Sequence, residues 1–431
     1  MFGGGHSKMD KKYRRLPLVL LATCTMIAFM LTVRLSSSSA GTDTPLSANV
    51  IKDFSGRFSD CLAAAPSLSL AKHDADKNST QNMINYIAKS YGAVGVQVAV
   101  IQNGTVTDSY AYGSATKGVQ DMTVSTKIRV ASISKVVLGM AVMSLQEDGV
   151  IDIDKDISNY WGAAIKNPYY KDTPVTIRSI LSHTSSIASY GDGVSTSGSS
   201  IKNKLTSSSC FSRLVPGSIS SWEYNNYAFA VLGVTLENAA NETVNSIMDQ
   251  KFFDLLDIDA SFGSGNVDAS KLATLYYHDG SVAKSIADQK ASAGSTYPGQ
   301  TGTCYCGGLT ISSYDLAKLV AILANDGIYD NLQMLSRQSV GLMETISDQK
   351  APDKPFYQGL PLRYQTQIYG QASLYYHTGS SYGAYNCVSY NPDTKNGVVV
   401  LSTGAGGAKD RFGIYNICGD ISQYIYNTLR Q

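Results

Sequence analysis

Six serines in the sequence have a lysine three residues later, but only one of these pairs stands at the head of a strongly apolar segment. That pair is Ser132 and Lys135, followed by the uncharged run from Val136 to Leu145. A run that is apolar on every side predicts a buried helix. On a helix the two side chains would lie one turn apart on the same face, so that the lysine amine reaches the serine hydroxyl. A serine hydroxyl is a poor nucleophile unless a neighbour takes its proton, and this spacing supplies such a neighbour.

The pair alone leaves a structural alternative open, in which Ser132 caps the helix and Lys135 extends along its surface. Two downstream segments favour catalysis. In PGSISSWEYNNYAFAVLG, Tyr224 and Asn226 are two residues apart just before an apolar helix, so both side chains would project the same way from an extended loop. In LYYHTGSSYG, the His-Thr-Gly of residues 377–379 lies on a predicted strand, where the glycine would let a substrate backbone lie against the edge.

These three motifs, in this order, resemble the signature of the serine β-lactamase and penicillin-binding protein superfamily. The closest resemblance is to the class C β-lactamase and D-Ala-D-Ala carboxypeptidase branch, in which the second motif starts with tyrosine. The flanking segments LQEDGVIDIDKDISNYW, TIRSILSHTSSI and GGLTISSYDLAKLVAILANDG are similar to segments of that group as well. The resemblance therefore extends from about residue 81 to the C-terminus.

The resemblance implies a role for each matching position. Ser132 would attack the carbonyl carbon of an amide, ester or β-lactam and become acylated. Lys135 would help to remove its proton, with Tyr224 as partner base and later as proton donor to the leaving group. Asn226 would hydrogen-bond the amide side chain of the substrate. The backbone N–H groups of Ser132 and Ser380 would form the oxyanion hole, in which one donor is typically worth about 10² to 10³ in rate.

The third motif, His377-Thr378-Gly379, is predicted to bind substrate, but it begins with histidine where many β-lactamases have lysine. Histidine is largely neutral at pH 7, so its attraction for a substrate carboxylate is weaker than that of lysine. His-Thr-Gly resembles certain carboxypeptidases, D-amino-acid peptidases and esterases of the group instead, which leaves the substrate open. Arg363 is a candidate carboxylate anchor, although a solvated surface position is favoured for it, and His183 is expected to be structural.

The first forty residues differ from the rest of the chain. An uncharged run at residues 16–33 follows five basic residues, Lys8, Lys11, Lys12, Arg14 and Arg15. The run is near the lower limit for a membrane span and longer than the usual core of a signal peptide. We expect an uncleaved anchor in the cytoplasmic membrane, with cleavage after Ala40 as the alternative. In either case the basic end would stay in the cytoplasm and the rest would be exported.

Composition excludes some partners and cofactors. The 35 basic and 34 acidic residues give no electrostatic argument for a nucleic-acid partner. No cluster of cysteine, histidine and aspartate has zinc-ligand spacing, so we predict neither metal nor cofactor. Six of the seven cysteines would lie in an oxidising compartment. We predict one disulfide, between Cys387 and Cys418, and the alternative is that the cysteines are small buried apolar residues.

The order of predicted elements indicates the domain organisation: an anchor or signal segment at residues 1–40, a tether at 41–79 and a catalytic domain at 80–431. Strand-like alternation at 95–102 and 106–112, around an Asn103-Gly104 turn, returns at 374–379 and 397–402. Residues from about 157 to 290 are helical segments between polar loops. We predict an α/β (α+β) fold, with a central antiparallel sheet that is built from both chain ends, flanked by helices and interrupted by a mostly helical subdomain.

Together these features predict an exported serine hydrolase that acts on an amide or peptide bond ending in a D-amino acid, with a small-molecule or peptide substrate. One alternative is a β-lactamase or esterase of the same fold. Another, of a different class, is a receptor that is acylated by a penicillin or peptide and does not turn over. Loops at 157–215 and 280–305 are expected to shape the pocket, but they contain no recognisable specificity signal.

Overall fold

The computed structural model describes residues 76–191 and 194–429. The chain divides into two units, residues 1–73 and 74–431. The predicted anchor or signal segment, most of the tether and Cys61 lie outside the described residues, and the first described residues, 76–90, are helical. Among the helices of the described ranges, none combines the length and the apolar character needed to cross a bilayer.

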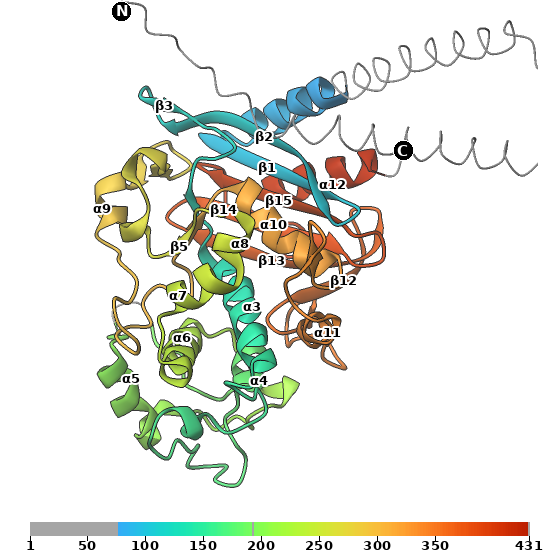
Figure 1. Ribbon diagram of the computed structural model, residues 1–431. Helices are drawn as coiled ribbons and strands as arrows, with labels where there is room; N and C mark the ends of the chain where they lie inside the picture. The colour runs from blue at the N-terminus through green and yellow to red at the C-terminus, as the bar shows by residue number, and fades with distance from the viewer. Residues whose placement is uncertain (1–75, 192–193, 430–431) are drawn as a thin grey trace, which may run out of the picture. The chain divides into compact units, whose positions relative to one another are not determined.

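The centre of the fold is an antiparallel sheet of eight strands in the order β11-β12-β13-β14-β15-β1-β2-β3 (Figure 1). The prediction of one sheet made from both ends of the chain is confirmed, because the early strand β1 pairs with the late strand β15. The strands are β1 (Gly95–Gln102), β2 (Thr105–Thr116), β3 (Gln120–Asp121), β11 (Tyr357–Gln358), β12 (Arg363–Ile368), β13 (Gln371–Ser381), β14 (Ala384–Asn391) and β15 (Asn396–Thr403).

The hairpin between β1 and β2 turns where the sequence predicts it. Asn103 has a φ of 51° and Gly104 a φ of 75°. Two consecutive left-handed residues make the tight turn that matches the twist of paired strands, and asparagine and glycine tolerate this conformation best. The predicted strand at residues 374–379 is longer in the structure, and it pairs with β14, which the sequence pattern did not reveal.

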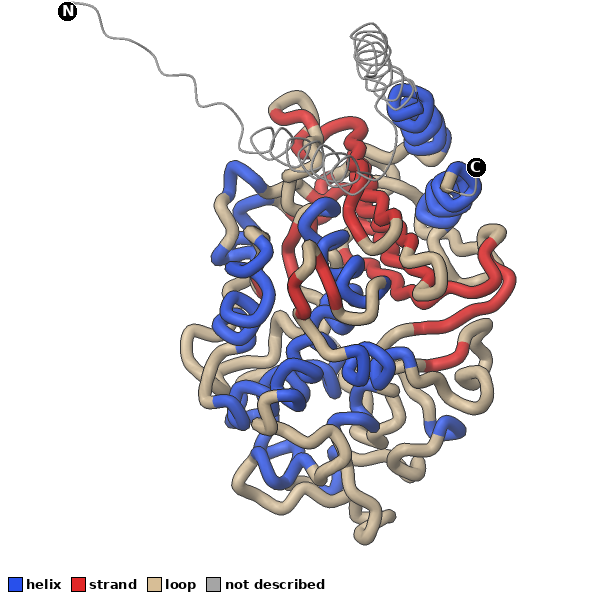
Figure 2. Tube along the Cα trace, turned by 45° about the vertical axis from the view of Figure 1, so that its right-hand side comes forward, coloured by secondary structure: helices blue, strands red, loops and turns tan. Residues whose placement is uncertain are grey.

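Helices cover both faces of the sheet. On one face, helix 76–90 and α12 (Asn416–Thr428) share an apolar core with the strands, and Tyr91 Oη donates to Asp420 of α12 at 2.5 Å. On the other face, α10 (Ser313–Ala324) packs against β1 and β15. Both views show the sheet between these helices, with the mostly helical part of the chain beyond α10 (Figures 1 and 2). The predicted α/β architecture is therefore confirmed.

The region between the two sets of strands holds helices and a few short strands. Its helix α3 (Ser134–Glu147) is buried from Ser134 to Leu145, as its apolar sequence predicts. The other helices are α4 (Ile177–Leu181), α5 (Gly198–Leu205), α6 (Asn226–Ala240), α7 (Val244–Met248), α8 (Asp254–Leu256), α9 (Ile286–Lys290) and α11 (Arg337–Glu344). The short strands are β4 (Ile128–Arg129), β5 (Ser261–Phe262), β6 (Leu275–Tyr276), β7 (Val282–Lys284), β8 (Leu309–Ile311), β9 (Ile328–Tyr329) and β10 (Leu332–Gln333).

The predicted disulfide between Cys387 and Cys418 is not formed, and this prediction was wrong. Both cysteines are free and buried, Cys387 on β14 and Cys418 on α12. The two elements do pack against each other, as expected. Each thiol instead contacts a backbone carbonyl, Cys387 that of Val388 and Cys418 that of Tyr385, and burial raises the pKa of both thiols. They behave as the small buried apolar residues of the alternative interpretation.

Candidate active site

Ser132 lies in a single 3-10 turn, Ala131–Ile133, that leads directly into α3. Ala131 has a φ of 52°. This left-handed conformation costs a residue other than glycine about 1–2 kcal/mol. The turn is fixed because Ser134 Oγ donates to the Ala131 carbonyl at 2.6 Å and accepts from the Leu309 N–H at 3.0 Å. The serine is thus held at the tip of a constrained turn and is partly exposed.

Lys135 is fully buried, and three oxygen atoms surround its side-chain nitrogen. They are Ser132 Oγ at 3.2 Å, Asn226 Oδ1 at 2.8 Å and the Cys306 carbonyl at 2.5 Å. Three acceptors match the three N–H donors of an ammonium group. An ammonium group at this position therefore has an acceptor for each of its donors, which offsets the cost of burying it. The contribution of Cys306 is a backbone carbonyl, which sequence reasoning did not find.

The Tyr224 hydroxyl interacts with both Lys135 and Ser132. Burial disfavours a phenolate, but the positive charges of Lys135 and Arg363 outweigh it, so the pKa of Tyr224 lies below its usual value. The Lys135 nitrogen is 5.0 Å from the centre of the Tyr224 ring, and the Arg363 guanidinium is 5.9 Å from it. This environment prepares Tyr224 to accept a proton.

The segment that carries Tyr224 is aligned by His183. The Asn225 N–H donates to His183 Nδ1 at 3.2 Å, and the Glu223 N–H donates to the His183 carbonyl at 2.9 Å. The His183 ring also lies against the Tyr224 ring, with 4.5 Å between the ring centres. Asn225 caps α6 through its side chain, which places Asn226 at the first position of that helix. His183 is structural, as expected, and the structure adds that it positions the Tyr224 motif.

The third motif lies on a part of β13 that, among the described residues, has no strand partner on one side. Strand β12 pairs with β13 only up to Tyr376. Residues 377–381 therefore keep a free edge beside the Ala131–Ile133 turn, which carries the predicted nucleophile and is called the nucleophile turn below. At Gly379, a Cβ atom would meet the Val130 carbonyl oxygen at 2.1 Å. The predicted need for glycine is therefore met for a different reason, because the missing side chain admits the nucleophile turn itself. Ser380 follows on the same free edge and is exposed.

His377 and Thr378 do not have the environment that the sequence suggested. His377 is 1% exposed and does not line the cavity described below, and its Nδ1 is 2.7 Å from the Thr378 carbonyl oxygen. Burial, together with the charges of Arg363 and Lys135, holds the pKa of His377 well below its usual value. A buried neutral imidazole does not suit direct contact with a substrate carboxylate. Thr378 Oγ1 accepts from the Arg363 guanidinium at 2.9 Å.

Arg363 is part of this site, although its surroundings could not be read from the sequence. It is partly buried and stacks on Phe356, with 4.6 Å between the guanidinium carbon and the ring centre. Lys409 lies close by, and its pKa is lowered by partial burial and by the charges of Arg363 and Lys354. Among the described residues, none of the ion pairs includes any of these three cations. The sequence held one signal for this position. Arg363 lies a short distance before the third motif, where a strand that pairs with the motif's own strand would be expected.

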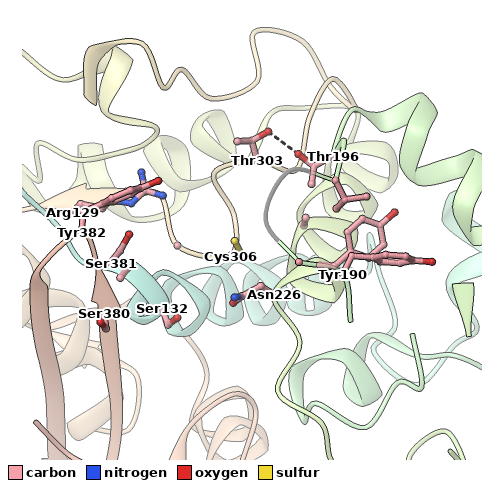
Figure 3. Close-up of a pocket in the computed structure, with 16 residues that line it drawn as sticks. Arg129, Ser132, Tyr190, Thr196, Asn226, Thr303, Cys306, Ser380, Ser381 and Tyr382 are labelled. Atoms are coloured by element: carbon pink, nitrogen blue, oxygen red, sulfur yellow. Dashed lines mark hydrogen bonds between the residues drawn. The ribbon is translucent and has the colours of Figure 1, made fainter. Parts of the chain in front are cut away.

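A cavity of about 580 Å³ opens beside Ser132 (Figure 3). Its lining residues come from strand β13 and from the region between the two sets of strands, and they include Arg129, Ser132, Tyr190, Asn226, Cys306 and Ser380. The segments expected at 157–215 and 280–305 do contribute to its wall, and the second continues past its predicted end to Cys306 and Gly307. Over residues 76–191 and 194–429, no three His, Cys, Asp or Glu side chains are grouped so as to hold a metal ion.

A model of the family described as Beta-lactamase matches residues 78–417. Protein flp of Staphylococcus aureus (strain MRSA252) is 26% identical over 157 residues, which is 35% of this chain and 30% of that protein. The D-alanyl-D-alanine-carboxypeptidase/endopeptidase AmpH of Escherichia coli (strain K12) is 22% identical over 202 residues, 44% of this chain and 52% of that protein. The matches thus span about half or less of the length of these relatives.

The fold is shared with solved structures as well. The D-amino acid amidase from Ochrobactrum anthropi SV3, complexed with L-phenylalanine, has a TM-score of 0.63 and 20% identity, covering 82% of this chain and 98% of that one. At this identity the likeness establishes the fold. Because the family model covers most of the chain, the chain belongs to the beta-lactamase family.

Proposed function

We propose that the protein is an exported hydrolase that forms an acyl-enzyme at Ser132 and cleaves the amide bond before a C-terminal D-amino acid. The observation that carries this proposal is the position of Arg363 beside Tyr224, with its guanidinium bonded to Thr378. In the reaction proposed here, Tyr224 gives a proton to the leaving nitrogen, so the leaving group lies next to Tyr224. A cation at that place suits a leaving group that carries a carboxylate.

The proposed acylation uses three side chains. Ser132 Oγ attacks the carbonyl carbon, and its proton passes to the Tyr224 phenolate, which the charge of Lys135 stabilises. The C–N bond then breaks, and Tyr224 returns the proton to the leaving amine. Water next attacks the ester carbon and regenerates the Ser132 hydroxyl. The backbone N–H groups of Ser132 and Ser380 are proposed to bind the developing oxyanion.

Two further facts support a D-amino-acid leaving group. Lys409 and Lys354 add positive charge near Arg363, and neither takes part in any of the ion pairs among the described residues, so the local field attracts a carboxylate. The names of two similar proteins, a D-alanyl-D-alanine-carboxypeptidase/endopeptidase and a D-amino acid amidase, both refer to D-amino acid derivatives.

The test compares two peptides that end in D-Ala-D-Ala, one with a free carboxylate and one with a C-terminal amide. The full chain should prefer the free carboxylate, and the variant Arg363→Gln should reduce the ratio of the two kcat/KM values by about 10- to 100-fold, as expected for a lost charged hydrogen bond. The control Arg337→Gln removes an exposed arginine of α11 and should keep the ratio. A wild-type ratio near one would contradict the proposed leaving-group specificity.

Assays on the same full-length protein distinguish a peptidase from a β-lactamase and from a receptor that does not turn over. Steady release of D-alanine over many turnovers supports the peptidase. Fast turnover of a penicillin without D-alanine release would instead identify a β-lactamase, and a single burst of labelling without turnover would identify a receptor. Export is tested separately by adding protease to intact cells, where cleavage of the catalytic domain is expected and full protection would contradict it.

A further inference from the structure

Among the described residues that line the cavity beside Ser132, Arg129 is the one with a charged side chain. Figure 3 shows it next to Tyr382 on one side of the cavity, with Tyr190 on the other side and Ser132 between them. Tyr224 and Arg363 do not line this cavity, whereas Asn226 does. If the leaving group lies next to Tyr224, as proposed above, this cavity receives the acyl part of the substrate.

The Arg129 guanidinium has unused hydrogen-bonding capacity. Its Nε atom is buried and has no hydrogen-bond partner among the described residues. None of the ion pairs formed within residues 76–191 and 194–429 includes Arg129. The guanidinium instead stacks on Tyr382, 5.6 Å from the ring centre, and Lys284 lies 4.6 Å from the same ring. Stacking fixes the plane of the guanidinium and leaves its N–H groups for a bidentate acceptor.

The backbone holds Arg129 in a fixed position relative to the nucleophile. It ends β4, which pairs with β8, and it stands three residues before Ser132. Its carbonyl accepts from Asn386 Nδ2 at 3.1 Å, which ties it to β14 of the main sheet. A guanidinium at the end of the strand that leads into the Ser132 turn is suited to recognise a group at a defined distance from the scissile carbonyl.

Tyr227 also lines the cavity, but its hydroxyl is placed differently from the Arg129 guanidinium. The hydroxyl is buried without a hydrogen bond among the described residues. Burial and the neighbouring Cys210 and Tyr190 raise the pKa of Tyr227, and Cys210 does not line the cavity. A buried polar group that lacks a partner costs free energy, and a bound acceptor would remove that cost for the Arg129 Nε atom.

We propose that this cavity selects acyl groups that carry a carboxylate, and that Arg129 binds this carboxylate. The inference rests on the acyl-enzyme at Ser132 proposed above. Arg363 is proposed to bind a carboxylate on the leaving-group side, and Arg129 one on the acyl side. The two proposals together predict a substrate with an anionic group on each side of the bond that is cleaved. An acidic peptide, such as one with a glutamate residue before the D-amino acid, has this chemistry.

The test uses p-nitrophenyl esters, whose leaving group carries no amino acid, so that it does not depend on the proposed leaving-group specificity. Half-esters of succinate, glutarate and adipate are compared with the neutral butyrate, pentanoate and hexanoate esters. We expect the full chain to prefer the anionic acyl group at one chain length. In Arg129→Gln, the ratio of anionic to neutral kcat/KM at that length should fall by about 10- to 100-fold. Lys284→Gln is the matched control, because Lys284 touches the same tyrosine ring but does not line the cavity.

Three results would overturn the inference. Wild-type rates that are equal for the anionic and neutral esters, or acylation by neither, would exclude selection for a carboxylate. An equal loss of both rates in Arg129→Gln would show that Arg129 supports the turn and does not bind substrate.

A second variant gives a result that would support the inference. Arg129→Lys keeps the charge but not the planar fork, and it should retain part of the preference for the anionic ester. Peptide hydrolysis that fails while this preference holds would remove the D-amino-acid proposal and keep the present one.

Discussion

The side-chain nitrogen of Lys135 lies 5.0 Å from the centre of the Tyr224 ring. The first and second motifs are far apart in the sequence, yet the charge of one lowers the pKa of the other. Lys135 also donates to three acceptor oxygens, which match the three N–H donors of an ammonium group. In the reaction proposed above, Lys135 supplies positive charge beside the phenol, and Tyr224 is the group that exchanges a proton.

Lys135→Ala should slow the acylation of Ser132 by a fluorophosphonate probe by about 10²- to 10⁴-fold, because the stabilised phenolate is lost as a base. Mass spectrometry should place the adduct on Ser132 in the wild-type protein. The control Lys318→Ala removes another buried lysine, one that donates to the Leu256 and Asp257 carbonyls away from the site. It should lower stability and leave labelling of the folded protein intact. Unchanged labelling of Lys135→Ala would refute the role of the lysine.

The rate of acylation by the same neutral probe should rise with pH through the pKa of Tyr224, which lies below its usual value. Arg363→Gln removes a positive charge near the phenol, which disfavours the phenolate, so the pKa should rise and the rising limb should move to higher pH. His183 and His377 should add no limb near pH 6.5, since burial holds the pKa of both well below that value. A pH profile of labelling rates tests this, and a limb that stays in place in Arg363→Gln would contradict it.

Gly379→Ala should destabilise the protein by about 1–3 kcal/mol, the usual cost of overpacking, because the new Cβ would overlap the Val130 carbonyl oxygen. It should also displace the nucleophile turn and slow acylation. Gly341→Ala is the matched control in α11, where a Cβ atom meets nothing within 4 Å. That change should stabilise the helix by about 0.5–1 kcal/mol. Urea unfolding measures both, and equal effects of the two substitutions would argue against the close contact at Gly379.

Cys387 and Cys418 are both free thiols, so adding a reductant breaks no bond between them. The thermal midpoint of unfolding should therefore be the same with and without reductant. Alkylation after unfolding without reductant, followed by mass spectrometry, should modify both residues. Alkylation of the folded protein should spare them, since each is buried and its thiol pKa is raised. A peptide pair linked through these two cysteines would show that the disulfide forms after all.

Local patterns were enough for several features of this protein. The Asn103-Gly104 turn, the alternating strands around it and the apolar helix after Ser132 all follow from residues close together in the chain. The order of the three motifs also indicated the family, and the model over residues 78–417 confirmed it. These features depend on local backbone preference and on the spacing of apolar residues, which a sequence displays directly.

Tertiary structure decided what stands around the motifs. The Cys306 carbonyl that accepts from Lys135, the Arg363 guanidinium beside Tyr224 and the His183 ring that aligns it all come from distant segments. The same holds for Cys387 and Cys418, which pack on adjacent elements without bonding. Contacts of this kind depend on how strands and helices pack in three dimensions, and so do burial and local charge, which set the pKa of each group. The sequence alone therefore predicted which serine would react, whereas only the folded chain showed which charged groups surround that serine.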